Sequence, residues 1–222
     1  IYLEVVPITG SPDKPVVSGK GKAFEYAVKM LQFPQSAQLD NMLAAGELKA
    51  EHMDSLARMT ADFHHTAASA NATMDYGEKD VLYHPVNENF QQIKEHLDTK
   101  IYAEKLSVLL QWTESEFVKL ATVFGQRKRD GFIRECHGDM HLRNLIWLND
   151  QPMAFDCIEF NSHLSWIDVI SEVAFLVMDL QSHQQHQLAN RFLNQYLEIT
   201  GDYAGLVIIN FYLCYRALVR AK

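Results

Sequence analysis

One short segment carries residue types and a spacing that suit phosphoryl transfer. His137 precedes Asp139 by two residues, and Asn144 follows Asp139 by five. In loops of the pattern H-x-D-x-x-x-x-N, the carboxylate orients an attacking hydroxyl group, and the amide oxygen helps to hold Mg²⁺ against the phosphates. The segment therefore predicts Asp139 as the catalytic residue and Asn144 as a magnesium ligand.

A second metal ligand is expected at the end of the hairpin that follows this loop. Leu145–Leu148 and Pro152–Phe155 are typical of two strands joined by a short turn, and Asp156 comes directly after them. Oxygen ligands from Asn144 and Asp156 suit a hard cation such as Mg²⁺. Glu159, three residues further on, could reach the same metal ion.

These residues resemble a known family. The segment His137–Asn144 resembles the H-G-D-x-H-x-x-N loop of aminoglycoside phosphotransferase-like and choline-kinase-like enzymes. Four other stretches are similar to one uncharacterised bacterial branch of that family: Glu25–Met30, Phe155–Asn161, Trp166–Asp168 and Gly201–Tyr203. The resemblance implies a protein-kinase-like α+β fold, ATP as the phosphate donor and Mg²⁺ as the metal ion. The acceptor would be a hydroxyl of a small-molecule alcohol or amino-alcohol.

The resemblance also implies supporting roles around the loop. Asp168 would lie on the following helix and hold the backbone of the catalytic loop by hydrogen bonds. His141 would brace the loop, and His137 is interpreted as a buried structural histidine. The same comparison assigns the metal to Asn144 and Asp156.

Lys29 is an evident candidate for the lysine that binds the α- and β-phosphates of ATP, called the phosphate-gripping lysine below. After Lys29, however, the chain passes Pro34 and enters helical patterns, an order that resembles the last strand and hinge of the small lobe. Adenine would then contact the backbone of Val28, Lys29, Met30 and Leu31. The resemblance places the phosphate-gripping lysine upstream of Ile1, so this fragment alone would lack part of the nucleotide site and could be inactive.

Turn and helix signals divide the chain into two parts. Two β-rich stretches read as a hairpin with a long loop, and helical periodicity follows. We therefore predict a truncated small β lobe over residues 1–34 and a mainly α-helical large lobe over residues 35–222, with the catalytic loop at 137–144 and the metal-binding hairpin at 145–156. A polar loop is expected over 69–88, and helices are expected over 36–46, 53–65, 89–124 with a break near Thr99, 166–180, 184–200 and 206–222.

Composition narrows the class of protein. The 222 residues carry a net charge of −8 without a basic stripe, which argues against a nucleic-acid partner. No signal peptide is visible, and no apolar run is expected to span a bilayer. The three cysteines are sparse and odd in number, which favours reduced thiols and a cytoplasmic location. The chain begins and ends inside regular patterns and reads as a fragment. The resemblance implies that an N-lobe portion lies upstream and a P-loop domain lies downstream.

Two other functions fit parts of the sequence. A kinase-like lobe without the upstream lysine could bind a nucleotide or regulate a partner without turnover. Alternatively, His137, Asp139 and His141, with Cys136 and Cys157 nearby, could form a zinc hydrolase site, although this spacing lacks a second ligand pair. Near the C-terminus, the pattern favours a solvated helix face for Arg216, Arg220 and Lys222.

Overall fold

The computed structural model describes residues 1–96 and 99–222. Contacts within the chain define two compact units, Ile1–Ala37 and Gln38–Lys222, close to the boundary expected at residue 34. The lobe identities assigned to these two parts remain a prediction. The helix break expected near Thr99 falls on residues 97–98, which lie outside the described residues.

The first unit is a three-stranded antiparallel sheet in the order β2-β1-β3, followed by one turn of 3₁₀ helix, η1. The elements are β1 (Tyr2–Ser11), β2 (Lys14–Val17), β3 (Glu25–Met30) and η1 (Gln35–Ala37). The sequence pattern predicted β1 and β3 but treated β2 as loop. The reason is Pro15, which is tolerated in β2 because this strand is an edge strand that pairs only with β1.

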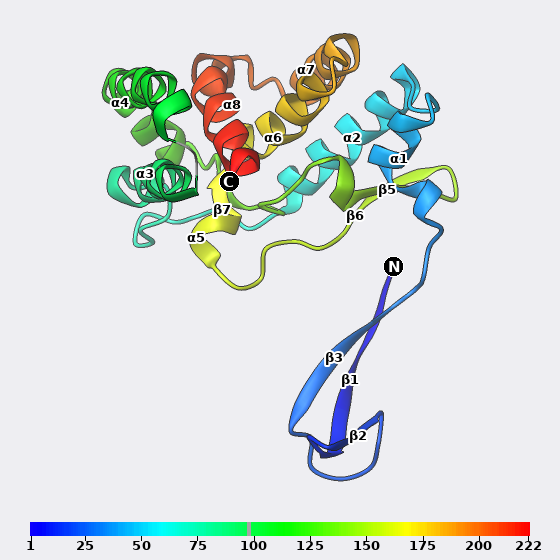
Figure 1. The fold of residues 1–222 in the computed structure, drawn as a ribbon. Coiled ribbons are helices and arrows are strands. Elements are labelled where there is room, and N and C mark those ends of the chain that lie inside the picture. Colours follow the sequence, from blue (N-terminus) through cyan, green and yellow to red (C-terminus); the bar gives the residue numbers. More distant parts are fainter. Residues whose placement is uncertain (97–98) are drawn as a thin grey trace. The chain divides into compact units, whose positions relative to one another are not determined.

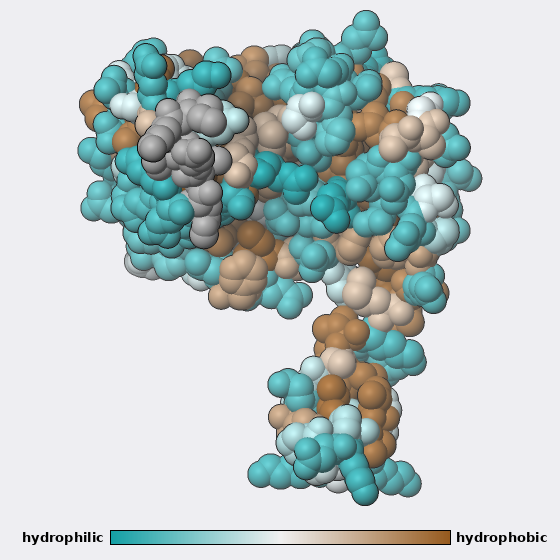
Figure 2. Space-filling model, in the orientation of Figure 1, coloured by the Kyte–Doolittle hydropathy of each residue, from teal (hydrophilic) through white to brown (hydrophobic). Residues whose placement is uncertain are grey.

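Most large apolar side chains of this sheet are exposed. Within the first unit, only Val6, Thr9 and Ala37 are buried. Figure 2 shows the resulting hydrophobic surface over the strands, and its exposed apolar members are Tyr2, Leu3, Val5, Val16, Val17, Phe24, Tyr26, Val28, Met30 and Leu31. The sheet therefore has almost no hydrophobic core within its own unit.

The second unit is mainly helical and is organised around one central helix, α6 (Val169–Ser182). Every residue of α6 from Val169 to Leu180 is buried, because the helix packs against both α7 and α8 (Figure 1). A helix that is apolar on all sides is expected at such a position. The other helices of the unit are α1 (Leu39–Ala44), α2 (Ala50–Thr66), α3 (Lys79–His96), α4 (Thr99–Arg129), α5 (Ser162–Ser165), α7 (His186–Thr200) and α8 (Leu206–Ala221).

Short strands connect these helices and frame the predicted catalytic loop. β4 (Ile133–Glu135) pairs antiparallel with β7 (Trp166–Asp168), and β5 (Leu145–Leu148) pairs with β6 (Gln151–Ala154). Two single 3₁₀ turns complete the unit, η2 (Leu142–Asn144) and η3 (Tyr203–Gly205). The chain is thus a mixed helix-and-strand protein with small sheets, as the α+β prediction requires.

Two predicted elements have boundaries that differ from those in the structure. The helix expected from Trp166 begins at Val169, because residues 166–168 form β7 against β4. The loop expected over 69–88 becomes helical at Lys79, in spite of Pro85 inside α3. There, burial of the apolar side chains of Val86, Phe90 and Ile93 outweighs the local loop signals.

One segment bears on the expectation that no apolar run could span a bilayer. Among the described residues, Tyr203–Ala221 has the length and composition of a membrane span. In this structure, however, α8 packs against α6 and buries Ile208, Phe211 and Arg216. The apolar character of α8 is therefore explained by its place in the core of the second unit.

Candidate active site

The predicted catalytic loop leaves β4 through a sharp backbone bend at Gly138. This residue has a φ of +82°, in the left-handed region, and a β-carbon there would lie 2.7 Å from the carbonyl oxygen of Leu164. Only glycine satisfies both conditions. The bend turns the chain from β4 into the segment that carries Asp139.

The structure brings Asp139, His141 and Asn144 together. Nδ2 of Asn144 donates to the backbone oxygen of Asp139 at 3.0 Å and to its Oδ2 at 2.8 Å. Nε2 of His141 lies 3.4 Å from the same Oδ2. Because the amide nitrogen of Asn144 faces Asp139, its Oδ1 remains available as an oxygen ligand for a cation.

Neighbouring side chains stabilise the ionised form of the Asp139 carboxyl group. Burial raises the pKa of this carboxyl group, but a hydrogen bond and charge from His141, the charge of Arg216 and the hydrogen bond from Asn144 lower it. The net effect is a pKa below the usual value. Asp139 is therefore an ionised carboxylate at neutral pH, the form that can accept a proton.

Backbone contacts anchor the residue before Asp156 beside the loop. The N–H of Phe155 donates to the oxygen of Asn144 at 3.0 Å. Nε2 of His137 lies 2.8 Å from the oxygen of Phe155, so this nitrogen carries the proton. Asp156 follows with a φ of +61°, a left-handed conformation that aspartate tolerates better than most residues. Its side chain is exposed, as is that of Glu159, and the metal roles of both remain predictions.

Two carboxylates on α6 hold the loop in place. Glu172 accepts the backbone N–H groups of His137 at 3.2 Å and of Gly138 at 2.6 Å. Asp179, two turns later, accepts the N–H of Leu142 at 2.9 Å. Nε2 of His64, from α2, lies 2.9 Å from the Glu172 carboxylate. Neither α6 carboxylate was identified from the sequence.

The prediction that Asp168 holds the catalytic-loop backbone is wrong. Its carboxylate accepts two hydrogen bonds from Arg127, at 2.7 and 2.9 Å, and caps the first turn of α6 through the N–H of Ile170. Arg127 also donates to Asp202 at 2.7 and 2.9 Å. Asp168 starts at the end of β7, and this geometry directs it toward α4 rather than toward the loop. It supports the helical unit instead.

We expect the Asp168→Asn substitution to lower the free energy of unfolding by about 3–5 kcal/mol, because a buried Arg127 would lose one of its two anionic partners. Urea unfolding followed by circular dichroism measures this change. Asp130→Asn is the control, since Asp130 is exposed and, among the described residues, its carboxylate has a hydrogen bond only with Gln126. A loss below about 1 kcal/mol would show that the bridge contributes no more than a surface pair.

The prediction of a solvated face for Arg216 is also wrong. Arg216 is only 3% exposed, donates through Nη1 to the oxygen of Gly138 at 3.0 Å, and donates through Nε to the oxygen of Ser171 at 3.1 Å. Its guanidinium lies over the ring of Phe175, with 4.7 Å to the centroid. Phe175 in turn contacts the ring of His141 edge-on. Arg216 therefore connects α8 and α6 to the catalytic loop.

The predicted nucleotide-contacting segment lies on β3 of the first unit. Lys29 is more than half exposed, and its Nζ pairs with Glu4 of the neighbouring strand at 2.8 Å. A kinase lysine pairs instead with a glutamate on a helix. The partner of Lys29 is on a strand, and its assignment to the hinge strand remains a prediction, as does nucleotide binding by Val28, Lys29, Met30 and Leu31.

We expect Lys29→Met to lower stability by less than about 1 kcal/mol, because it removes one exposed ion pair. If the full-length protein transfers phosphate from ATP, its turnover should persist, and steady-state kinetics with varied ATP measures this. Glu4→Gln is the matched control, since it removes the same pair from the other side. A loss of turnover with Lys29→Met that Glu4→Gln does not share would identify Lys29 as the phosphate-gripping lysine.

The proposed zinc ligands are not gathered into one site. Among the described residues, one buried group could offer three metal-ligating atoms within 4.8 Å of one another, and its members are His64, Cys136 and Glu172. That group contains neither His137 nor His141. The ring of His137 is engaged by the backbone of Phe155 and Asp139. The structure thus gives the hydrolase hypothesis no assembled ligand set in the part of the chain that it describes.

A hollow of about 480 Å³ opens between α3 and α5, and its link to the loop is Leu164. One of its lining residues, Leu164, presents the carbonyl that packs on Gly138. The other lining residues include two carboxylates and three further polar side chains, namely Asp80, Glu88, His84, Asn161 and His163. This hollow is therefore acidic and adjoins the bend before Asp139.

Comparison with known proteins agrees with this arrangement. The model of the phosphotransferase enzyme family matches residues 37–206. Uncharacterised proteins of Mycobacterium bovis and Mycobacterium tuberculosis are 30% identical to the chain over 199 residues, which cover 89% of this chain and 40% of each relative. The chain thus spans less than half the length of these curated relatives. Because the family match includes the catalytic loop, the hairpin after it and the helix that supports it, the chain belongs to the phosphotransferase enzyme family.

Proposed function

We propose that the chain is the acceptor- and metal-binding part of an ATP- and Mg²⁺-dependent phosphotransferase that acts on a hydroxyl of a small molecule. The observation that carries this proposal is the contact between Asn144 and Asp139, which orients both side chains within one loop. Family membership supports phosphoryl transfer in general. ATP as the donor, Mg²⁺ as the metal ion and a small-molecule alcohol as the acceptor are proposed.

The donor atoms near the loop fit a magnesium ion. Asn144 is buried, its amide nitrogen is used by Asp139, and no hydrogen bond to its Oδ1 is found among the described residues. Asp156 adds a carboxylate beyond the hairpin, and Glu159 is a further candidate. Oxygen donors of this kind suit Mg²⁺. When bound, Mg²⁺ would neutralise charge on the β- and γ-phosphates of ATP.

Asp139 would orient the acceptor hydroxyl and accept its proton. Its lowered pKa keeps it ionised, and Asn144 and His141 fix its direction. Gly138 lets the backbone turn immediately before this carboxylate. Glu172 then limits movement of the bend by accepting two consecutive backbone N–H groups. These residues together would position a hydroxyl for in-line attack.

The acidic hollow beside the loop supports an amino-alcohol as the acceptor. Asp80 and Glu88 supply negative charge, and Asn161 supplies a polar group, at a place adjoining Gly138. A protonated amine would be attracted to these carboxylates, and a hydroxyl on the same molecule could reach the loop. Neutral alcohols would bind there less well.

The full-length protein would complete the nucleotide site. The exposed apolar surface of the first unit supports the proposal that further strands of an N-lobe cover it, with adenine near Val28–Leu31. A downstream P-loop domain and a cytoplasmic location are also proposed. The length of the curated relatives leaves room for such additional parts.

A phosphate-transfer screen on the full-length protein tests the proposal. ATP labelled at the γ-phosphate and Mg²⁺ would be offered with a panel of amino-alcohols, neutral alcohols and sugars, and the Asp139→Asn variant serves as the control. Transfer to at least one hydroxyl compound, abolished in the variant, is the expected result. Tight Mg²⁺-dependent ATP binding without transfer to any compound would favour a non-catalytic module instead.

A further inference from the structure

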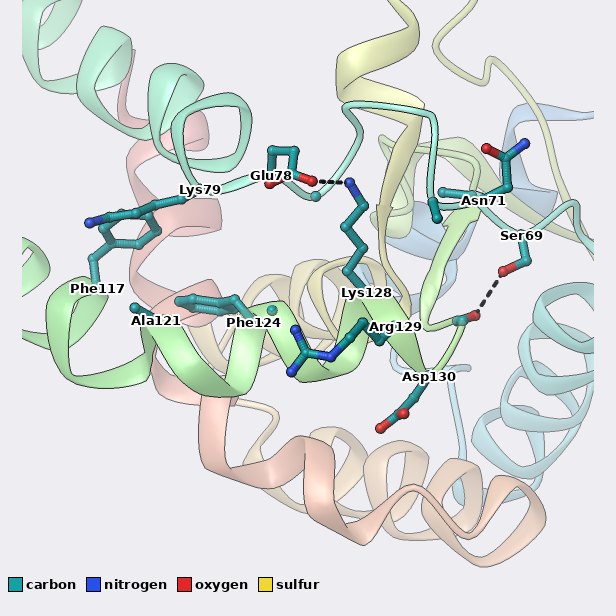
Figure 3. Close-up of a pocket in the computed structure, with 15 residues that line it drawn as sticks. Ser69, Asn71, Glu78, Lys79, Phe117, Ala121, Phe124, Lys128, Arg129 and Asp130 are labelled. Carbon is teal, nitrogen blue, oxygen red and sulfur yellow. Dashed lines mark hydrogen bonds and ion pairs between the residues drawn. The ribbon is translucent and has the colours of Figure 1, made fainter.

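A second hollow of the helical unit is lined by none of the loop residues 137–144. It encloses about 560 Å³ between the segment 69–79 and the last turns of α4. Figure 3 shows this hollow with the side chains that line it. Its residues Asp130 and Gly131 precede β4, whereas His137 follows that strand. The volume is in the range of small-molecule binding pockets.

The floor of this hollow is apolar and comes from one face of α4. Phe117, Ala121, Phe124 and Gly125 recur at helical spacing and all line it. Opposite them, Lys128 reaches from α4 to the segment 69–79, where Nζ donates to the oxygen of Met74 at 2.8 Å and pairs with Glu78 (Figure 3). This contact ties the segment to the helix and closes one side.

Two cations at the rim have no anionic partner. Among the described residues, Arg129 contacts only the neutral side chain of Gln126, at 2.8 Å, and Lys79 lies over the ring of Phe117, 6.0 Å from its centroid. By contrast, Glu78 is neutralised by Lys128. Asp130 also lines the hollow, and its carboxylate accepts from the neutral Gln126 rather than from a cation. The charges without an ion pair are therefore two cations against one carboxylate, in a chain whose net charge is −8.

Gly125 is a second, independent indication of a ligand. A glycine inside a helix costs about 1 kcal/mol relative to alanine. The backbone does not require it, because its φ lies outside the left-handed region. Packing does not require it either, since an added β-carbon would meet only the Arg129 guanidinium, at an ordinary 3.5 Å. The absence of a side chain at Gly125 leaves space in the floor of the hollow.

We propose that this hollow binds an amphipathic organic anion. The apolar body of the ligand would lie on Phe117 and Phe124 over the space at Gly125, and its anionic group would meet Arg129 and Lys79. This chemistry is opposite in charge to that of the acidic hollow beside the catalytic loop. The site is therefore distinct from the acceptor site and does not depend on phosphotransfer.

Anilinonaphthalene sulfonate, a fluorescent aromatic anion, is a suitable probe for the full-length protein. Its fluorescence should rise on binding and should be reversed by decanoate, which shares its charge, but not by decylamine, which has the same apolar length and the opposite charge. Equal displacement by both compounds would overturn the proposal, because apolar contact alone would then account for binding.

Substitutions at the hollow test whether the probe binds there. Arg129→Gln should weaken binding by up to about fivefold, as expected for loss of one partly exposed ion pair. Gly125→Leu should weaken it by more than about tenfold by filling the floor. Lys119→Gln is the matched control, because Lys119 lies on the same helix, is exposed and pairs with Glu116 outside the hollow. Arg129→Gln replaces an exposed side chain, so it decides the case if Gly125→Leu unfolds: affinity equal to the control would overturn the proposal.

Discussion

Replacement of Asp139 by asparagine is expected to lower kcat for phosphotransfer by about a hundredfold to ten-thousandfold, the usual contribution of a positioned proton acceptor. Asparagine has the same shape but cannot accept the hydroxyl proton. Its amide would also disturb the contact in which Nδ2 of Asn144 donates to the Asp139 carboxylate at 2.8 Å. Steady-state kinetics of the full-length protein, with calorimetry of ATP binding, separates the loss of turnover from any loss of affinity.

Asp150→Asn is the matched control for this experiment. Asp150 lies in the turn between β5 and β6, is exposed, and has a φ of +59°, a conformation that aspartate and asparagine both tolerate. This variant should keep its activity. If Asp139→Asn keeps full activity as well, Asp139 is not the proton acceptor and the assignment of the loop is wrong.

The second large effect is expected from Glu172→Gln. Glu172 is fully buried and accepts hydrogen bonds from two consecutive loop N–H groups while its carboxylate contacts His64. A glutamine would present an NH₂ group to one of these donors and would remove the carboxylate that Nε2 of His64 contacts. We expect a loss of about 3–5 kcal/mol in the free energy of unfolding, measured with urea at pH 7.

This loss should depend on pH. Burial raises the pKa of Glu172, but the hydrogen bond and charge of His64, the charge of His137 and the N–H of Gly138 lower it below its usual value. Its stabilising effect is therefore complete above the unfolded-state pKa of about 4.3 and disappears as the pH falls through the lower folded-state pKa. The stability difference between wild type and Glu172→Gln should shrink below about pH 4. A difference that stays constant from neutral to strongly acidic pH would contradict this reasoning, and Glu135→Gln, on the exposed side of β4, is the control.

The centre of the site was predictable because its signal is local. His137, Asp139 and Asn144 lie within eight consecutive residues, so their spacing alone brings their side chains together, and the strands after them have an ordinary hairpin pattern. Asp168 shows the limit of this approach. Its position in the sequence suggested a role beside the loop, but pairing of β7 with β4 turns it toward Arg127.

The supporting residues were missed because their partners are distant in the sequence. Glu172 contacts residues 34 and 35 positions earlier, and Arg216 contacts Gly138 across 78 positions. A usable signal was nevertheless present. Glu172 and Asp179 are isolated charges in the otherwise apolar α6, and Arg216 lies between apolar residues of α8, one turn before the exposed Arg220. A lone charge within an apolar helix indicates a buried polar contact, because an unpaired buried charge is costly.

The two bidentate contacts of Arg127 also bear on how the second unit folds. This residue of α4 connects the start of α6 with the turn before α8, through Asp168 and Asp202. A chain that ended before Asp202 would leave a buried guanidinium with half of its counter-charge. The helices from α4 to α8 are therefore expected to unfold together in one cooperative transition, and no shorter autonomous subdomain is expected within them. Because Arg216 of α8 donates to Gly138, the predicted catalytic loop is expected to acquire its full set of contacts only after α8 has packed against α6.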